Sequence, residues 1–299
     1  MNCNYKVAGL GELLWDVLPQ GKQLGGAPCN FAFHALQTGC DAYIVSAIGT
    51  DIEGEEILRV LNQLKLKADF IQTMSGYPTG MVTVKLNDSG IPNYTIHENA
   101  AWDNIEFPDG IIPLAREMDA VCFGSLAQRN DVSRNTILQF LEITKSECLR
   151  VFDINLRQSF YNQEIIEKSL ELANVLKLND DELLIVSEYF GCQGDEESRL
   201  KQLADDFQLM LIAFTKGSKG SLLFTKTEKS YCEVPTIRVA DTVGAGDSFT
   251  AILISGMLNK MKLEEIHSAA TNVAAFVCTM HGATPKLPEH LLNQIDSRI

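Results

Sequence analysis

The segment DTVGAGDSF, residues 241–249, holds the residue types best suited to chemistry in this sequence. Gly244, Ala245 and Gly246 come directly before an apolar run with helical spacing. The free N–H groups at such a helix start can bind a phosphate, and glycines let a phosphoryl group approach the backbone. Asp247 falls in the first turn, where its carboxylate could accept a proton from a neighbouring hydroxyl. The alternative is an ordinary capped helix after a glycine turn, and this segment alone favours neither.

A second glycine-led helix start, GGAPCNFAF, lies near the beginning of the chain, and GELLWDVLP precedes it. The two acidic residues of GELLWDVLP are expected at the end of a strand, close to the glycine pair and an asparagine. Such a group can bind several hydroxyls of a polyol by hydrogen bonds. Asp16 has a second interpretation, as a turn residue before Pro19. The candidate polyol-binding residues are Glu12, Asp16, Gly25, Gly26 and Asn30.

Three further segments, DINLR, KLNDDE and FTKGSKGS, place polar residues at or after the ends of expected strands. The arginine of the first could neutralise a moving phosphoryl group. The glycines of the third suit the sugar or phosphates of a nucleotide, although a plain β-turn is the simpler interpretation of that segment alone. The candidates in these segments are Arg157, Lys177, Asn179, Glu182, Gly217 and Gly220.

The elements that must position these residues alternate along the chain. Short apolar runs predict strands at 5–11, 42–49, 119–124, 149–155, 175–179 and 209–215. Segments with helical spacing separate several of them, at 53–66, 132–146, 163–174 and 195–207, and helical material closes the chain. This order predicts a parallel sheet covered by helices on both faces. Ligands of such sheets bind at the carboxyl ends of the strands.

The region 79–96 departs from this order, because its apolar and polar residues alternate around a turn at 87–90. That pattern predicts an antiparallel hairpin. With residues 12–24 it could form a small separate sheet, which would be either an addition to the edge of the main sheet or a lid over the crevice. We see neither a linker nor a repeat, so one domain over residues 1–299 is expected.

The composition narrows the possible partners. The chain has 39 acidic and 25 basic residues, a formal net charge of −14, which argues against nucleic-acid and anionic-membrane partners. The sequence shows no signal-peptide pattern and no apolar stretch of membrane-spanning length. Its eight cysteines form no C-x-x-C pair, so a dense disulfide framework or a cysteine metal site is not expected. A cytoplasmic protein with mostly buried free thiols is expected.

Taken together, five motifs resemble the ribokinase-like PfkB family of carbohydrate kinases over essentially the whole chain. DTVGAGDSF is similar to the family's C-terminal signature and GGAPCNFA to its N-terminal one. The patterns D-x-N-x-R in DINLR, N-x-x-E in NDDE and T-x-G-x-x-G in TKGSKG fall where the family has them. GELLWDVLPQGKQLGGAPCNFAFHA and GSLAQR are most similar to the bacterial fructokinases. The resemblance implies a three-layer α/β/α sandwich with a mostly parallel central sheet and a small β-sheet lid, drawn from about residues 12–24 and 79–100.

The resemblance also implies an activity: transfer of the γ-phosphoryl group of ATP to a sugar hydroxyl, with fructose as the expected acceptor. Asp247 would be the base, beside an anion hole formed by Gly244, Ala245, Gly246 and the Asp247 amide, with Arg157 near the phosphoryl path. The sugar would bind Glu12, Asp16, Gly25, Gly26 and Asn30. The nucleotide would bind Lys177, Asn179, Thr215, Gly217, Gly220 and Asn272, with Asn272 near the adenine, and Glu182 would help hold Mg²⁺ through water.

Two departures from the family pattern carry expectations of their own. Ile154 stands where the family often has proline, which is expected to change the stiffness of the loop more than the chemistry. Lys286 occupies a position where relatives that bind a monovalent cation often have a small polar residue. Its ammonium could replace or repel K⁺ near Asp241, a residue that would shape the loop or a cation site. The alternative is that Lys286 points to solvent.

Other interpretations stay open at this stage. The acceptor could be ribose, 2-keto-3-deoxygluconate, inositol or a nucleoside, because few pocket residues distinguish polyols. The same fold could also serve a non-catalytic sugar or nucleotide sensor. GLGELL has part of a dinucleotide-binding fingerprint but lacks its third glycine, and no P-loop motif is present. A homodimer formed through the lid is a further expectation.

Overall fold

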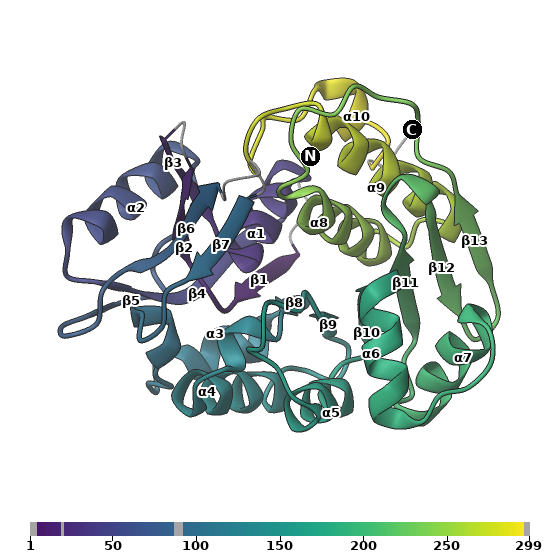
Figure 1. Ribbon diagram of the computed structural model, residues 1–299, viewed down its shortest axis with the longest axis horizontal. Helices are drawn as coiled ribbons and strands as arrows, with labels where there is room; N and C mark the ends of the chain where they lie inside the picture. The colour runs from purple at the N-terminus through teal and green to yellow at the C-terminus, as the bar shows by residue number, and fades with distance from the viewer. Residues whose placement is uncertain (1–4, 19–20, 87–91, 296–299) are drawn as a thin grey trace.

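The computed structural model describes residues 5–18, 21–86 and 92–295. Within these residues, nine strands form a large sheet in the order β13-β12-β11-β10-β9-β8-β1-β4-β5. A second sheet has four strands in the order β3-β2-β6-β7. Figure 1 shows this small sheet beside the β4–β5 edge of the large one.

Seven strands of the large sheet pair in parallel, and the last two join its edge by antiparallel pairing. The parallel ones are β1 (Lys6–Leu10), β4 (Asp41–Gly49), β5 (Ile71–Met74), β8 (Ala120–Phe123), β9 (Leu149–Asp153), β10 (Val175–Asn179) and β11 (Leu211–Thr215). The antiparallel ones are β12 (Ser221–Thr225) and β13 (Lys229–Cys232). All six predicted strands are present. The sequence analysis missed β5, β12 and β13, which are only four or five residues long.

Ten α-helices occur in the described residues, and five of them start at an Asp or Asn whose side chain accepts a backbone N–H. They are α1 (Ala27–Gln37), α2 (Ile52–Gln63), α3 (Ile111–Glu117), α4 (Asp131–Glu142), α5 (Gln163–Leu172), α6 (Asp180–Phe190), α7 (Glu196–Asp206), α8 (Ala245–Leu258), α9 (Leu263–Cys278) and α10 (Glu289–Leu292). The helices predicted at 53–66, 132–146, 163–174 and 195–207 correspond to α2, α4, α5 and α7, with ends that differ by at most four residues. Short 3₁₀ turns are η1 (Ala101–Asn104), η2 (Leu126–Gln128) and η3 (Gly217–Lys219).

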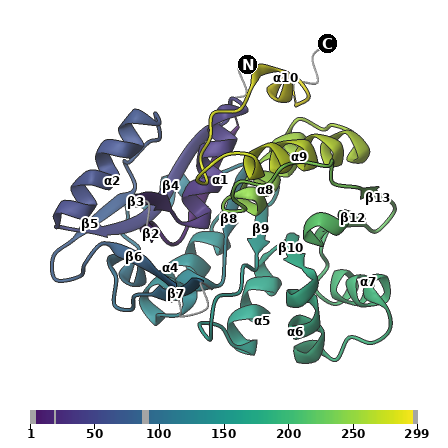
Figure 2. The same cartoon turned by 45° about the horizontal axis from the view of Figure 1, so that its top comes forward.

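Successive side chains of a strand point to opposite sides of the sheet. In the large sheet, helices cover both sides, so both sets of side chains are buried. In β9, Val151 packs into a core with α1, α8 and α9, whereas Phe152 packs into a second core with α4, α5 and α6. Figure 2 shows these two groups of helices on opposite sides of the sheet. The predicted three-layer α/β/α sandwich is therefore confirmed.

The small sheet consists of β2 (Leu14–Leu18), β3 (Gly21–Gly25), β6 (Gly80–Leu86) and β7 (Pro92–Ile96). The β2–β3 and β6–β7 pairs are antiparallel, and β2 pairs with β6 in parallel. The predicted hairpin is thus β6–β7, although its turn at 87–90 lies outside the described residues. Asp16 lies in the middle of β2, opposite Gln23, so it is neither at a strand end nor in a turn. Backbone pairing on both sides fixes its position.

Three neighbouring strands end in polar residues. Asp153, Asn179 and Thr215 are the last residues of β9, β10 and β11. Parallel pairing brings their carboxyl ends to one edge of the sheet. This edge is where a ligand of a parallel α/β sheet binds. A search of the described helices finds none that is long and apolar enough to cross a membrane.

The contact between β1 and α1 generates a stability prediction. A Cβ atom on Gly9 would lie 2.0 Å from the carbonyl oxygen of Pro28, so Gly9→Ala must push α1 away from the sheet. We expect a loss of about 2–3 kcal/mol of unfolding free energy, the usual cost of overpacking. Urea unfolding followed by circular dichroism measures it. The control is Gly110→Ala, because Gly110 is exposed, has φ −64°, and would place a new Cβ more than 4 Å from its neighbours. Equal urea midpoints for the two variants would contradict the prediction.

Candidate active site

The first residue of interest is Gly244, the N-cap of α8, which has φ 78° and ψ −5°. A Cβ atom there would lie 2.7 Å from the Cα, Cβ and O atoms of Ala283. Both the left-handed backbone and the close contact therefore require glycine. The helix begins at Ala245, so Asp247 falls in its first turn as predicted.

Two backbone amides at this helix start are available to a ligand. Ala245 N donates to Thr242 O at 3.3 Å, and Ser248 N donates to Gly244 O at 2.8 Å. In the part of the chain that the structure describes, the amides between them, of Gly246 and Asp247, donate to no protein acceptor. Together with the positive end of the helix dipole, they can bind an anion.

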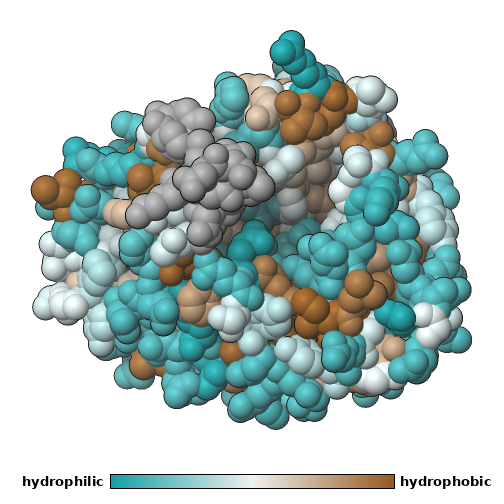
Figure 3. Space-filling model, in the orientation of Figure 1, coloured by the Kyte–Doolittle hydropathy of each residue, from teal (hydrophilic) through white to brown (hydrophobic). Residues whose placement is uncertain are grey.

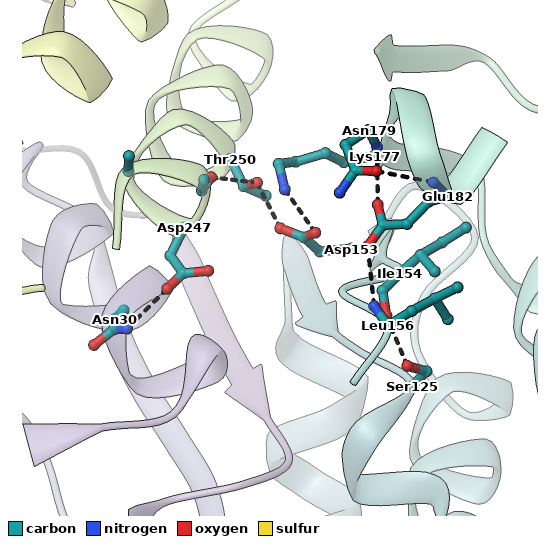
Figure 4. Close-up of polar contacts among 12 residues, drawn as sticks. Asn30, Ser125, Asp153, Ile154, Leu156, Lys177, Asn179, Glu182, Asp247 and Thr250 are labelled. Carbon is teal, nitrogen blue, oxygen red and sulfur yellow. Dashed lines mark hydrogen bonds and ion pairs between the residues drawn. The ribbon is translucent and has the colours of Figure 1, made fainter. Parts of the chain in front are cut away.

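The carboxylate of Asp247 is held beside these amides by α1. Asn30 Nδ2 donates to Asp247 Oδ2 at 2.7 Å, which Figure 4 shows. Burial, with a contribution from the charge of Asp153, raises the pKa of Asp247 to about 6, while the bond from Asn30 and the charges of Lys177 and Arg157 oppose this rise. At neutral pH the group is ionised and can accept a proton.

Two further carboxyl groups, of Glu12 and Asp16, lie within electrostatic range of Asp247. Glu12 is buried, and its Oε1 accepts the Ala27 amide at 3.2 Å. Burial raises the pKa of Glu12 to about 7 and that of the half-buried Asp16 to about 6, and in both cases Asp247 adds to the rise. Gly25 is needed beside Asp16, since a Cβ there would lie 2.2 Å from Asp16 Oδ2.

Unpartnered polar atoms identify what this group can bind. Glu12 Oε2 and Asn30 Oδ1 are buried and have no hydrogen-bond partner among the described residues. Buried acceptors without a partner are costly, and a ligand with hydroxyl donors would satisfy them. The arrangement therefore suits a polyhydroxyl compound.

A buried cation lies on the other side of the helix start. Lys177 Nζ donates to Asp153 Oδ1 at 2.7 Å, and it lies 3.1 Å from the position that a Cβ on Gly246 would take. Thr250 Oγ1 donates to Asp153 Oδ2 at 3.0 Å and also to Gly246 O at 3.0 Å (Figure 4). Lys177 thus places positive charge directly beside the free amides.

The part that Asp153 and Thr250 play here is not predicted from the sequence, where Asp153 is only the first residue of DINLR and Thr250 belongs to the apolar run. Two signals could have identified Asp153: it is a carboxylate at the end of a buried strand, and Lys177 is at the matching position of the next strand. A buried acid in that place requires a cationic partner.

Asn179 and Glu182 form a capping box that begins α6. Asn179 Oδ1 accepts the Glu182 amide, and Glu182 Oε2 accepts the Asn179 amide, each at 2.8 Å. Glu182 Oε1 also accepts the Leu156 amide at 2.9 Å, which fixes the loop that carries Arg157 (Figure 4). The sequence analysis did not predict α6, although N-x-x-E before an apolar run is the pattern of such a box.

These contacts bear on Mg²⁺, which the resemblance implies. Both carboxylate oxygens of Glu182 already accept backbone amides, and the described residues contain no group of three or more His, Cys, Asp or Glu that could hold a metal. Mg²⁺ usually keeps several waters and takes few protein ligands. The residues therefore fit an ion held through water and a ligand's phosphates.

The remaining nucleotide candidates lie further along the sheet edge and on α9. Thr215 ends β11, and Lys216 N donates to Gly220 O at 2.9 Å, which closes the turn containing Gly217 and Gly220. These two glycines have φ 51° and 100°. Asn272, on α9, donates to Gln294 Oε1 at 3.1 Å. In the described chain, no hydrogen bond links these residues to the α8 start.

Three other predicted residues have different surroundings. Arg157 is exposed, and its charge lowers the pKa values of Glu12, Asp16 and Asp247, so it lies within electrostatic range of all three. Asp241 accepts the amides of Val243 at 3.0 Å and Gly282 at 3.2 Å, and so shapes the loop before α8. Lys286 is exposed, in agreement with the alternative that it points to solvent.

Figure 3 shows the molecule hollowed near the centre of this face, with mostly hydrophilic residues in the hollow. The hollow lies between the part that holds the small sheet and the part that holds α6 and α7.

The dinucleotide-binding interpretation of GLGELL does not fit this structure. That fingerprint opens a helix, whereas β2 and β3 follow Gly11 here and the next helix begins at Ala27.

Comparison with known proteins identifies the family of this chain. The family model described as pfkB family carbohydrate kinase matches residues 4–290. The chain therefore belongs to this family, and it is a phosphotransferase with a hydroxyl acceptor.

Several relatives match over nearly their whole length. PH1459 of Pyrococcus horikoshii, described as a sugar kinase without an assigned sugar, is 29% identical over 95% of this chain and 94% of its own. Its structure in complex with ATP has a TM-score of 0.82 and 25% identity, over 98% of this chain and 100% of that one. The fructokinase of Klebsiella pneumoniae is 27% identical over 95% of this chain and 97% of its own. A Vibrio cholerae fructokinase variant, solved with fructose, ADP and a potassium ion, has a TM-score of 0.80 and 21% identity, over 99% of each chain.

The buried Glu12 generates a prediction about stability and pH. Its folded-state pKa of about 7 exceeds the ordinary value of 4.5, so between these pH values the folded protein binds more protons than the unfolded chain. Loss of the Glu12 proton therefore lowers the unfolding free energy as the pH rises from about 4.5 through 7. Glu12→Gln, which keeps the acceptor for Ala27 N, is expected to raise the unfolding free energy at pH 8 by about 1–3 kcal/mol.

The gain should shrink towards pH 5, where the carboxyl is protonated in the folded protein. Urea unfolding at both pH values measures it. The exposed Glu98→Gln serves as the control, with an expected change within about 0.5 kcal/mol at either pH. A Glu12→Gln variant that is less stable than the wild type at pH 8 would disprove the account of this residue.

Proposed function

We propose that this chain is an ATP-dependent fructokinase, which transfers the γ-phosphoryl group of ATP to a hydroxyl of fructose. One observation carries the proposal: the Asp247 carboxylate, fixed by Asn30, lies at the α8 start beside two amides without protein acceptors in the described chain. A base and an anion site are thereby combined in one helical turn. That combination is what phosphoryl transfer to a hydroxyl requires.

The proposed step proceeds in line. Asp247 accepts the proton of the sugar hydroxyl as the hydroxyl oxygen forms a bond to the γ-phosphorus. The bond between that phosphorus and the β,γ-bridging oxygen breaks, and ADP leaves with the electron pair. The Gly246 and Asp247 amides stabilise the charge on the transferring group, with Gly244 and Ala245 shaping the turn. Lys177 and Arg157 contribute positive charge from either side.

The other site residues have supporting roles in this proposal. Glu12, Asp16, Gly25, Gly26 and Asn30 bind the sugar, and Asn179, Thr215, Gly217, Gly220 and Asn272 bind the nucleotide. Mg²⁺ would be held near Asn179 and Glu182 through water, where it would supply charge neutralisation at the phosphates. A monovalent-cation site near Asp241, weakened or replaced by the ammonium of Lys286, stays a prediction.

Fructose is proposed because the Klebsiella pneumoniae relative is named a fructokinase and matches along 97% of its length. PH1459, at a similar identity, is named only a sugar kinase. Ribose, 2-keto-3-deoxygluconate, inositol and nucleosides therefore remain alternative acceptors. The role of the small sheet as a lid, a homodimer formed through it, a single-domain organisation and a cytoplasmic location also stay predictions.

A panel of sugars at fixed ATP and Mg²⁺ tests the proposal, with ADP release as the measurement. We expect the highest kcat/KM for fructose. Asp247→Asn keeps the shape of the side chain but removes the base, so it should lower kcat about 10²- to 10⁴-fold while ATP binding persists. Asp109→Asn, an exposed acid-to-amide change, is the matched control.

The panel also separates the alternatives. A higher kcat/KM for another polyol would replace fructose while keeping the chemistry. Binding of sugar and ATP without ADP release would favour the sensor. Near-normal turnover by Asp247→Asn would refute the proposed base.

A further inference from the structure

His34 is a buried residue that the mechanism above does not use, and it lies on α1 one turn after Asn30. Its Nε2 atom is 2.9 Å from the carbonyl oxygen of Ala283. Residues 30 and 34 are on the same face of a helix, because they are four positions apart. The helix that fixes Asp247 through Asn30 therefore also contacts the segment around Ala283.

The contacts of the ring define which nitrogen carries the proton. A carbonyl oxygen can only accept, so His34 Nε2 must be protonated and donate to Ala283. Nδ1 is then an acceptor, and Gln37 Nε2 lies 3.4 Å from it. Burial lowers the pKa of His34 to about 4, so the ring is neutral at neutral pH and keeps this tautomer.

Gln37 extends the contact by one more turn of α1. Its Nε2 donates to Pro285 O at 3.3 Å, and its Oε1 accepts the Leu287 amide at 2.8 Å. One face of α1 thus holds backbone groups of residues 283, 285 and 287. On its other side, this segment contacts Gly244 through Ala283.

The contact with Gly244 connects His34 to the anion site. Because a Cβ on Gly244 would lie 2.7 Å from three atoms of Ala283, the two residues are packed backbone to backbone. A shift of Ala283 must therefore move or release Gly244, the cap that precedes the free amides of Gly246 and Asp247. The amide of Gly282 also donates to Asp241, so the segment contacts both the loop before α8 and the cap itself.

We propose that His34 is a positioning residue for phosphoryl transfer, which holds Ala283 against Gly244 and so aligns the α8 amides with the Asp247 carboxylate. This inference rests on the proposed function of those amides as the anion hole. Through α1, the same helix sets the position of both the base and the anion hole. His34 touches neither the sugar nor the phosphate.

Two substitutions separate positioning from simple packing. His34→Leu keeps much of the volume but has no donor, whereas His34→Gln places an amide donor near the position of Nε2. We expect His34→Leu to lower kcat at least tenfold with a change of less than threefold in the KM for fructose. His34→Gln should stay within about threefold of the wild-type kcat, because the bond to Ala283 is restored.

The control is Thr38→Val at the C-cap of the same helix. Thr38 Oγ1 is 2.8 Å from Ser255 Oγ, a partner on α8 that lies about 16 Å along the helix from Gly244. The change removes a buried polar contact from the same helix pair, so we expect a lower melting temperature and an unchanged kcat. Should His34→Leu fail to fold, His34→Asn replaces it, since its shorter amide cannot reach Ala283.

Hydrogen–deuterium exchange provides a readout that needs no turnover. His34→Leu should speed amide exchange in residues 242–250 and 281–287, and Thr38→Val should not. If His34→Leu speeds exchange in these residues but the wild-type protein shows no kinase activity, the proposed kinase function is refuted. The positioning of the α8 amides by His34 is then still supported. An unchanged exchange pattern and kcat in His34→Leu, or equal losses in the Leu and Gln variants, would overturn the role of His34.

Discussion

The start of α8 is subject to one constraint on which the rest of the site depends: two amides must stay free of protein acceptors while the helix around them is buried. Gly244 makes this possible, because its left-handed backbone turns the chain into the helix without a side chain over the amides. The same turn is closed from behind by Ala283, packed at a distance that excludes any other residue at position 244. The proposed phosphoryl site is thus supported by close backbone packing behind the helix start.

Charge is the second constraint, since the chain carries a net charge of −14 and concentrates Glu12, Asp16, Asp153 and Asp247 around a site for anions. Burial and mutual repulsion raise the pKa values of Glu12, Asp16 and Asp247, so the folded protein forgoes some stability at neutral pH. Among these carboxylates, Asp153 forms an ion pair with Lys177 at 2.7 Å. The ammonium of that pair faces the free amides, and the pair thereby makes the site attractive to an anion in spite of the carboxylates around it.

The local features of the site could be predicted from the sequence, and its long-range contacts could not. The glycines of DTVGAGDSF and GGAPCNFAF indicate two helix starts, and both are present. The hydrogen bond between Asn30 and Asp247 joins residues 217 positions apart, and it depends on how α1 packs against α8. No periodicity contains that information. The resemblance to the PfkB family implies which residues form the site, but it does not indicate His34, Asp153 or Thr250, whose contacts are with residues on other elements. For Asp16, the local pattern suggests a wrong position. The nearby Pro19 favours a turn, whereas pairing of β2 with β3 and β6 places Asp16 in the middle of a strand.

The central claim is that the amides at the start of α8 bind the transferring phosphoryl group while Asp247 faces the acceptor hydroxyl. A crystal structure of the protein with fructose, ADP, Mg²⁺ and aluminium fluoride tests it most directly. The account predicts fluoride atoms within about 3 Å of the Gly246 and Asp247 amide nitrogens, and a fructose hydroxyl hydrogen-bonded to the Asp247 carboxylate. Aluminium fluoride bound elsewhere, with both amides still facing solvent, would contradict it.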